Sequence, residues 1–193
     1  FQGIVLLPYI EAVDGKTNFL IFALTDNDSN LIVMPKLLSH YFDYTTPTII
    51  TIPTVKAILG AADYAAKTLD VQYGMEVACR TGENNHELDP TRTKLLYATD
   101  GFVSSKINSD PTLSGYGGII IDEIHTRGVN IDLLLSKVVE IAMERPEFKI
   151  VAMSATVDPQ IFKKFFNNYG IKYDLFHIKG KQSNHPVENI FSK

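Results

Sequence analysis

The sequence predicts an α/β domain built on a doubly wound parallel sheet with helices on both faces. Two observations predict it. Short apolar segments rich in Ile, Val, Leu and Phe recur between turn residues, and segments with helical spacing of apolar residues lie between them. Strands that are buried on both faces of a parallel sheet have continuous apolar sequences of this kind.

The strands are expected where the apolar segments are short and bounded by turn residues, and the helices where Ala, Ile, Leu and Val recur at helical spacing. Strands are predicted at residues 18–24, 48–52, 94–98, 118–122 and 149–154, and helices at residues 54–69, 131–143 and 159–167.

Composition restricts the classes of function. A chain of 193 residues that is 45% hydrophobic can bury one substantial core, which indicates a single domain. Its formal net charge of -4 argues against binding nucleic acid by bulk electrostatics, so any such contact must be local. The single cysteine, Cys79, excludes an intrachain disulfide and indicates a reducing intracellular compartment, cytoplasm or nucleus. No apolar run approaches 18 residues, so no membrane segment is expected.

An acidic pair and a histidine follow the fourth predicted strand. Asp122, Glu123 and His125 come directly after three isoleucines, at the carboxyl edge where open α/β sheets bind their ligands. An Asp at this place can bind a divalent cation, and a neighbouring Glu can orient the water that attacks a γ-phosphate. The alternative is that the pair simply ends a strand, because short motifs also arise without function.

Several segments then occur in a characteristic order. Thr99-Asp100-Gly101, Asp122 to Arg127 and Ser154-Ala155-Thr156 resemble, in order and spacing, the DEAH-type RNA helicases of superfamily 2. The resemblance covers roughly the whole chain after Ile49. It implies a RecA-like fold and a place for the chain as the first RecA-like domain of such a helicase.

The resemblance also implies roles and boundaries. Asp122 would bind the metal, Mg²⁺, that accompanies ATP, Glu123 would activate water, and His125 with Ser154, Ala155 and Thr156 would couple hydrolysis to movement between domains. Residues 4–178 would form the RecA-like domain, and residues 179–193 would lead toward a second RecA-like domain. Phe1-Gln2-Gly3 resembles the remnant of a tobacco-etch-virus protease site and is excluded from the fold prediction.

RNA is the partner that the resemblance implies, and a protein partner is a further expectation. The candidate contacts lie in two segments, each directly after a predicted strand. The family usually has paired arginines after the proline of the first segment, whereas here Lys56 presents a point charge instead of a planar fork. The candidate RNA-binding residues are Pro53, Thr54, Lys56, Thr99, Asp100 and Gly101.

The phosphate-binding loop departs from the family. Such a loop needs glycines that let backbone N–H groups surround the phosphates and a lysine that reaches the β and γ positions. Gly15-Lys16-Thr17 precedes the first strand and is interpreted as a turn. The segment after that strand has no glycine, Asn30 at the lysine position and two aspartates that repel polyphosphate. This degenerate loop comprises Thr25, Asp26, Asn27, Asp28, Ser29 and Asn30.

Two functions remain open at this point. The first is a helicase-derived pseudoenzyme with weak or no NTP hydrolysis, which acts as a scaffold or RNA-contacting module. The second is an active ATP-dependent RNA helicase with an unusual phosphate-binding loop that the second domain completes. A viral source is compatible with an acidic, strongly diverged member of the family.

Overall fold

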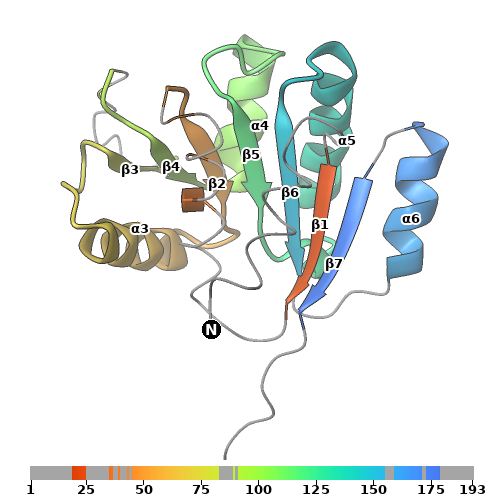
Figure 1. Ribbon diagram of the computed structural model, residues 1–193, viewed down its shortest axis with the longest axis horizontal. Coiled ribbons are helices and arrows are strands. Elements are labelled where there is room, and N and C mark those ends of the chain that lie inside the picture. Colours follow the sequence, from red (N-terminus) through yellow and green to blue (C-terminus); the bar gives the residue numbers. More distant parts are fainter. Residues whose placement is uncertain are drawn as a thin grey trace, which may run out of the picture.

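The described strands form one sheet in which every pair of neighbours runs parallel. The computed structural model describes residues 19–24, 35–36, 39, 43, 45–82, 89, 91–154, 159–170 and 173–178. Their seven strands lie in the order β3-β4-β2-β5-β6-β1-β7 (Figure 1). The bounds are Phe19–Leu24 for β1, Thr48–Thr51 for β2, Val77–Arg80 for β3, Leu95–Ala98 for β4, Gly118–Ile121 for β5, Lys149–Ser154 for β6 and Tyr173–Ile178 for β7.

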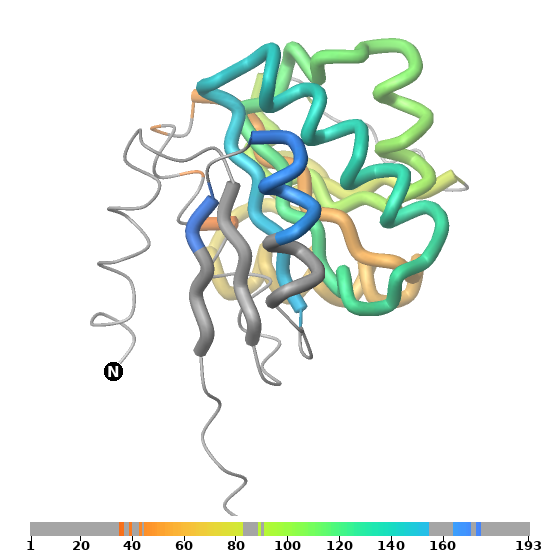
Figure 2. The backbone as a smooth tube through the Cα atoms, turned by 90° about the vertical axis from the view of Figure 1, so that its right-hand side faces the viewer, coloured from red at the N-terminus to blue at the C-terminus, as the bar shows by residue number. Residues whose placement is uncertain are grey.

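Helices cover both faces of this sheet, which confirms the predicted fold class. The helix α3 (Val55–Leu69) packs on one face, and α4 (Asp100–Ser109) and α5 (Val129–Glu144) pack on the other (Figures 1 and 2). The helix α6 (Pro159–Asn168) adds a buried phenylalanine to the α4 and α5 side. The architecture is the doubly wound α/β arrangement of RecA-like domains.

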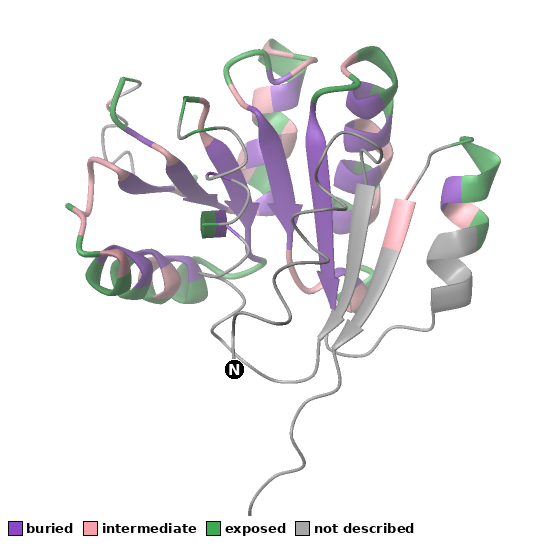
Figure 3. Ribbon diagram, viewed as in Figure 1, coloured by how far each residue is buried: buried purple, intermediate pink, exposed green. Residues whose placement is uncertain are grey.

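Two hydrophobic clusters fill the space between the helices and the sheet. Neighbouring residues of a strand point to opposite faces, so Ile49 joins the cluster under α4 and α5 while Ile50 joins the cluster under α3. The central strands are buried along their whole length, as Figure 3 shows. The buried face of α3 consists mainly of alanines. Its buried residues are Ile58, Ala62, Ala65 and Ala66.

The helices begin where side chains can satisfy the first backbone N–H groups. Thr54 precedes α3, and its hydroxyl accepts a hydrogen bond from the backbone N–H of Ala57 at 3.3 Å. Thr99 precedes α4 and accepts in the same way from Phe102 at 3.3 Å. Both threonines directly follow a strand or its extension, so these caps fix where the chain leaves the sheet.

The sequence predicted the main elements to within one or two residues and missed three others. The predicted strand at 118–122 ends at Ile121, because the backbone turns sharply at the residue after Asp122. No element was predicted at β3, α4 or β7. The helix α4 contains a glycine and three serines and has weak apolar periodicity, so its cap and its burial against α5 determine it rather than its sequence pattern. Within the described residues, no helix is both long and apolar enough to cross a membrane.

Candidate functional site

The carboxyl ends of five neighbouring strands lie along one edge of the sheet. These strands are β4, β2, β5, β6 and β1. All five strands point the same way, so the segments that follow them share this edge. β1 ends beside the end of β6, and Asp122 follows β5 on the other side of β6. The registers that establish this are Thr51 with Ala98 and Ile121, Ile121 with Ala152, and Ala23 with Ser154.

A short 3-10 turn, η1 (Ile124–Thr126), follows Asp122 and positions the acidic pair and the histidine. Glu123 has a left-handed backbone, with φ 56° and ψ 33°, which is uncommon for a residue other than glycine. The backbone N–H and the hydroxyl of Thr126 both donate to the Glu123 carbonyl oxygen, at 3.0 and 2.9 Å. Ile124 is fully buried in the core. The turn is therefore fastened to the sheet while Glu123 and His125 stay near the surface.

Glu123 and His125 contact each other directly. Nε2 of His125 lies 3.2 Å from Oε2 of Glu123, and their side chains are 25% and 42% exposed. Solvent can therefore reach this carboxylate, as a group that orients an attacking water requires. Nδ1 of His125 is buried and has no hydrogen-bond partner among the described residues. This nitrogen is available to a group outside the described part of the chain.

An ion pair that the sequence did not reveal closes the segment after the turn. Nε and Nη2 of Arg127 donate to Oδ1 and Oδ2 of Asp132 at 2.9 and 3.0 Å, in a bidentate arrangement. Asp132 lies in the first turn of α5, and Arg127 also has a left-handed backbone, with φ 50°. The two residues are five apart across the helix start, so no helical spacing rule marks them as partners.

Ser154 ends β6 at the same edge. It is 2% exposed, and its hydroxyl has no hydrogen-bond partner among the described residues. Buried hydroxyl groups are normally hydrogen-bonded, so an unsatisfied one at a strand end indicates a partner that the described residues do not supply. Ser154 pairs in register with Ala23, the residue before the last of β1.

Comparison with known proteins identifies the family. A provisionally assigned ATP-dependent RNA helicase of Acanthamoeba polyphaga mimivirus is 33% identical over 175 residues, which is 89% of this chain and 25% of the relative. The ATP-dependent RNA helicase HrpA is 38% identical over 119 residues in Borreliella burgdorferi and 36% identical over 138 residues in Escherichia coli strain K12. The chain is homologous to DEAH-type RNA helicases. No family model matches it.

The relatives are much longer than this chain. The two HrpA matches cover 62% and 72% of the chain but only 14% and 10% of HrpA. The chain thus spans a quarter or less of the length of each relative. The homology applies to one region of these helicases.

The candidate RNA-binding residues lie at two neighbouring helix starts. The strands β2 and β4 are adjacent, so Pro53 and Thr54 at the start of α3 lie beside Thr99 and Asp100 at the start of α4. The two threonine hydroxyls act as helix caps, which leaves the backbone N–H groups of the first turns as the anion-binding groups of this edge. Lys56 is exposed within the first turn of α3.

Asp100 is the one buried carboxylate among these RNA-contact candidates. Its side chain is 5% exposed, and Oδ1 has no hydrogen-bond partner among the described residues. Burial raises the pKa of the Asp100 carboxyl, and the nearby Thr51 hydroxyl opposes this by favouring the charged form. Gly101, which follows it, is exposed. Gly101 is therefore a better candidate for direct contact with RNA than Asp100.

The degenerate phosphate-binding loop, Thr25 to Asn30, lies outside the described residues, and so do Ala155 and Thr156. The acidic pair can be compared with the ligands that a bound Mg²⁺ ion needs. No group of three or more His, Cys, Asp or Glu side chains converges within the described ranges. Asp122 offers carboxylate oxygens at a half-buried strand end, and this fits Mg²⁺, which commonly uses one or two carboxylates with phosphate oxygens and water.

Proposed function

We propose that residues 4–178 form the first RecA-like domain of a DEAH-type RNA helicase with weak or no NTPase activity, which acts as a scaffold or RNA-contacting module. One observation carries the assignment. The contacting pair Glu123 and His125, together with Asp122, follows β5, one strand away from Ser154 at the end of β6 and two strands away from the end of β1. Residues 179–193 then lead to a second RecA-like domain that supplies the other half of the nucleotide site.

The residues of this edge support distinct roles toward nucleotide. Asp122 would hold Mg²⁺, which neutralises charge on the transferred phosphoryl group when it is bound. Glu123, oriented by its contact with His125, would position water at its exposed carboxylate. The unsatisfied Nδ1 of His125 and hydroxyl of Ser154 are placed to accept or donate hydrogen bonds when the second domain or the nucleotide approaches. If these two hydrogen bonds form only when the second domain closes on this one, hydrolysis would be coupled to domain movement.

Weak nucleotide binding is proposed from the loop sequence. Between Leu24 and Leu31 the chain has no glycine, lysine or arginine, and it carries Asp26 and Asp28. Without glycine the backbone N–H groups cannot wrap the phosphates, and without lysine the γ-phosphate loses a charged donor. The pseudoenzyme proposal therefore rests on electrostatics at this segment.

A second candidate is an active ATP-dependent RNA helicase whose phosphate-binding loop is completed by the second domain. Its support is that Glu123 and His125 make the contact that a working site needs, while Asp122 and Ser154 lie at the ends of the neighbouring strands β5 and β6, on the edge where β1 also ends. A cation from the second domain would then take the place of the absent loop lysine.

The two candidates are separated by measuring Mg²⁺-ATP binding and RNA-stimulated phosphate release on the full-length protein and its Glu123→Gln variant. The pseudoenzyme proposal expects no turnover above the variant, with RNA or a protein partner still bound. Turnover that the substitution abolishes would establish the active helicase instead. A full-length protein that binds neither nucleotide, RNA nor protein would exclude both.

A restored loop tests the electrostatic reasoning itself. Ser29→Gly, Asn30→Lys and Leu31→Thr together recreate the end of the family's loop, and the matched control carries Ser29→Gly and Leu31→Thr only. One charged hydrogen bond contributes about 1.5–3 kcal/mol, so the lysine should improve Mg²⁺-ATP affinity roughly tenfold to a hundredfold over the control. Equal affinities in calorimetric titration would show that the missing lysine is not what limits binding.

A further inference from the structure

A pocket of about 210 Å³ lies at the edge of the sheet opposite to the helicase motifs. Val77 and Leu95, the first residues of β3 and β4, pair in register and belong to its lining. Asp122 follows β5 and Ser154 ends β6, so both lie where strands end. This pocket lies where β3 and β4 begin. It is therefore distinct from the candidate nucleotide and RNA edge. Its lining residues are Lys36, Ser39, Leu69, Val71, Glu76, Val77, Lys94 and Leu95.

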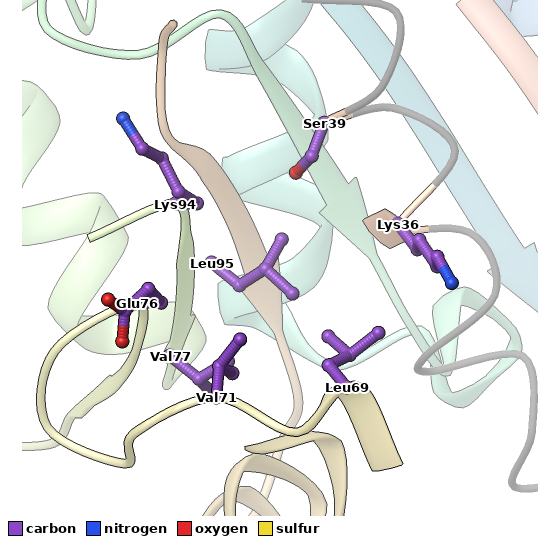
Figure 4. Close-up of a pocket in the computed structure, with 8 residues that line it drawn as sticks. All are labelled: Lys36, Ser39, Leu69, Val71, Glu76, Val77, Lys94 and Leu95. Atoms are coloured by element: carbon purple, nitrogen blue, oxygen red, sulfur yellow. The ribbon is translucent and has the colours of Figure 1, made fainter. Parts of the chain in front are cut away.

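The floor of the pocket is apolar. Figure 4 shows the side chains of Leu69, Val71, Val77 and Leu95 gathered at its centre. Val77 and Leu95 are almost completely buried, while Leu69 and Val71 are half-buried and keep apolar surface open to the pocket. Such a floor favours an apolar group, and the volume is below the roughly 300–1,000 Å³ of typical small-molecule sites. The volume suits one large apolar side chain better than a whole nucleotide.

The rim carries positive charge that is unusual for this acidic chain. Lys36 and Lys94 lie on opposite sides of the pocket (Figure 4), and neither forms an ion pair with a carboxylate of the described ranges. The only carboxylate of the described lining, Glu76, accepts a hydrogen bond from Arg92 at 2.6 Å, which lowers the pKa of its carboxyl. Arg92 thereby offsets its charge, and Lys36 and Lys94 remain as the charged groups of the described lining without an ion-pair partner.

A buried hydroxyl adds a specific hydrogen-bonding group. Ser39 is 1% exposed, and its Oγ has no hydrogen-bond partner among the described residues. Figure 4 shows this oxygen directed toward the apolar side chains at the centre of the pocket. Because buried hydroxyl groups are normally satisfied, an incoming acceptor such as a carboxylate would remove a real energetic deficit.

We propose that this pocket binds a peptide segment of a protein partner in which one large apolar side chain is flanked by carboxylates. The apolar side chain fills the floor over Leu69 and Val71, and the carboxylates lie between Lys36 and Lys94, with one of them accepting from Ser39. Nucleic acid has the charge for this rim but no side chain for the apolar floor. The inference does not depend on whether the chain hydrolyses ATP, since none of these residues belongs to the motif edge.

The test selects peptides from a phage-displayed library of random dodecapeptides with the 193-residue chain as bait, followed by fluorescence anisotropy with the enriched peptides. Lys36→Glu and Lys94→Glu should each weaken binding about three- to tenfold, as expected for exposed charge pairs turned repulsive. Alanine at the apolar residue of the peptide should weaken it roughly tenfold or more. Lys164→Glu, an equal charge change on the exposed part of α6, is the matched control and should leave affinity unchanged.

The outcomes decide the proposal in either direction. Enriched peptides with Leu, Ile, Phe or Met beside Asp or Glu, weakened by the two rim variants and not by the control, support it. Enrichment of no peptide, or binding that ignores the rim variants while circular dichroism shows them folded, overturns it. Displacement of the peptide by an RNA oligonucleotide would also overturn it in favour of a nucleic-acid surface. Glu123→Gln should not affect peptide binding, so failure here is separate from failure of the proposed helicase function.

Discussion

Replacing Gly101 by alanine should make the domain more stable and its complex with RNA weaker. Gly101 is the second residue of α4, is exposed, and a methyl group added to it would meet nothing within 4 Å. Glycine within a helix costs about 0.5–1 kcal/mol relative to alanine, so Gly101→Ala should add close to 0.5 kcal/mol at this first-turn position. Gly60, exposed in the middle of α3 with equally open space, is the matched control and should gain nearer 1 kcal/mol.

The RNA effect follows from the same geometry. If a phosphate approaches the first-turn N–H groups of α4, a methyl group at Gly101 lies in its path. Losing one charged hydrogen bond costs about 1.5–3 kcal/mol, which corresponds to roughly a tenfold to hundredfold weaker complex. Urea denaturation of the chain gives the stability change, and fluorescence anisotropy of the full-length protein with labelled RNA gives the affinity change. Gly60→Ala should alter stability alone.

Two results would refute this reasoning. Equal RNA affinity in both variants would show that the start of α4 does not contact RNA. A loss of stability in Gly101→Ala would show that the open space around this residue is filled in solution, which would invalidate the packing of the segment itself.

Three further substitutions test individual groups. Ser154→Ala removes a buried hydroxyl without a described partner, so stability should stay equal or rise by up to about 1 kcal/mol, and a clear loss in urea denaturation would show that the hydroxyl is already bonded. Burial raises the pKa of the Asp100 carboxyl above its ordinary 3.8, so ionisation of this group costs stability as pH rises through the raised pKa. Asp100→Asn should therefore stabilise the domain at pH 7, and this gain in stability should disappear below pH 3.8. Arg145→Ala should lower the free energy of unfolding by about 2–4 kcal/mol, because the guanidinium donates to two backbone carbonyl groups before β5 at 2.9 Å. Its control, Arg92→Ala, removes an exposed ion pair and should cost under about 1 kcal/mol. Comparable losses of stability in Arg145→Ala and Arg92→Ala would contradict the larger structural role given to Arg145.

The fold was largely predictable because its strands are buried on both faces. Runs such as the three isoleucines of β5 leave little alternative to a central parallel strand, and strand order along the chain then determines which segments share an edge. The helix α4 was not predictable in the same way. Its pattern is weak, and its stability comes from contacts with α5 and from the Thr99 cap, which involve tertiary structure that a local pattern does not contain.

The site was predictable in its residues but not in its geometry. The sequence indicated that Glu123 and His125 follow a strand, but their 3.2 Å contact requires the left-handed backbone at Glu123, which no rule for a glutamate predicts. The Arg127 and Asp132 pair was missed for a related reason, since it bridges a turn and a helix start. The parallel direction of the strands determines which edge of the sheet carries these residues, and the turn at Glu123 determines how their side chains contact each other.

Stability measurements can show whether folding alone explains the acidic pair and the histidine. Ile124 and the Arg127 pair have structural roles, because one is buried in the core and the other closes the turn. Among the described residues, the Glu123 carboxylate makes its one charged contact with His125, and both side chains are partly exposed. Glu123→Gln should therefore change the free energy of unfolding by less than about 0.5 kcal/mol, as for a surface substitution.

A larger loss in urea denaturation would give Glu123 a structural role, and its presence would then say nothing about hydrolysis. If the variant is as stable as the parent, folding does not explain the carboxylate, and the unsatisfied Nδ1 of its partner His125 is a cost that folding alone does not justify either. That result, obtained on the isolated chain, would exclude a structural role for the carboxylate and leave the turnover measurement to separate the active helicase from the pseudoenzyme. The loop variant with Asn30→Lys would then show how far the nucleotide site is from the strength that turnover needs.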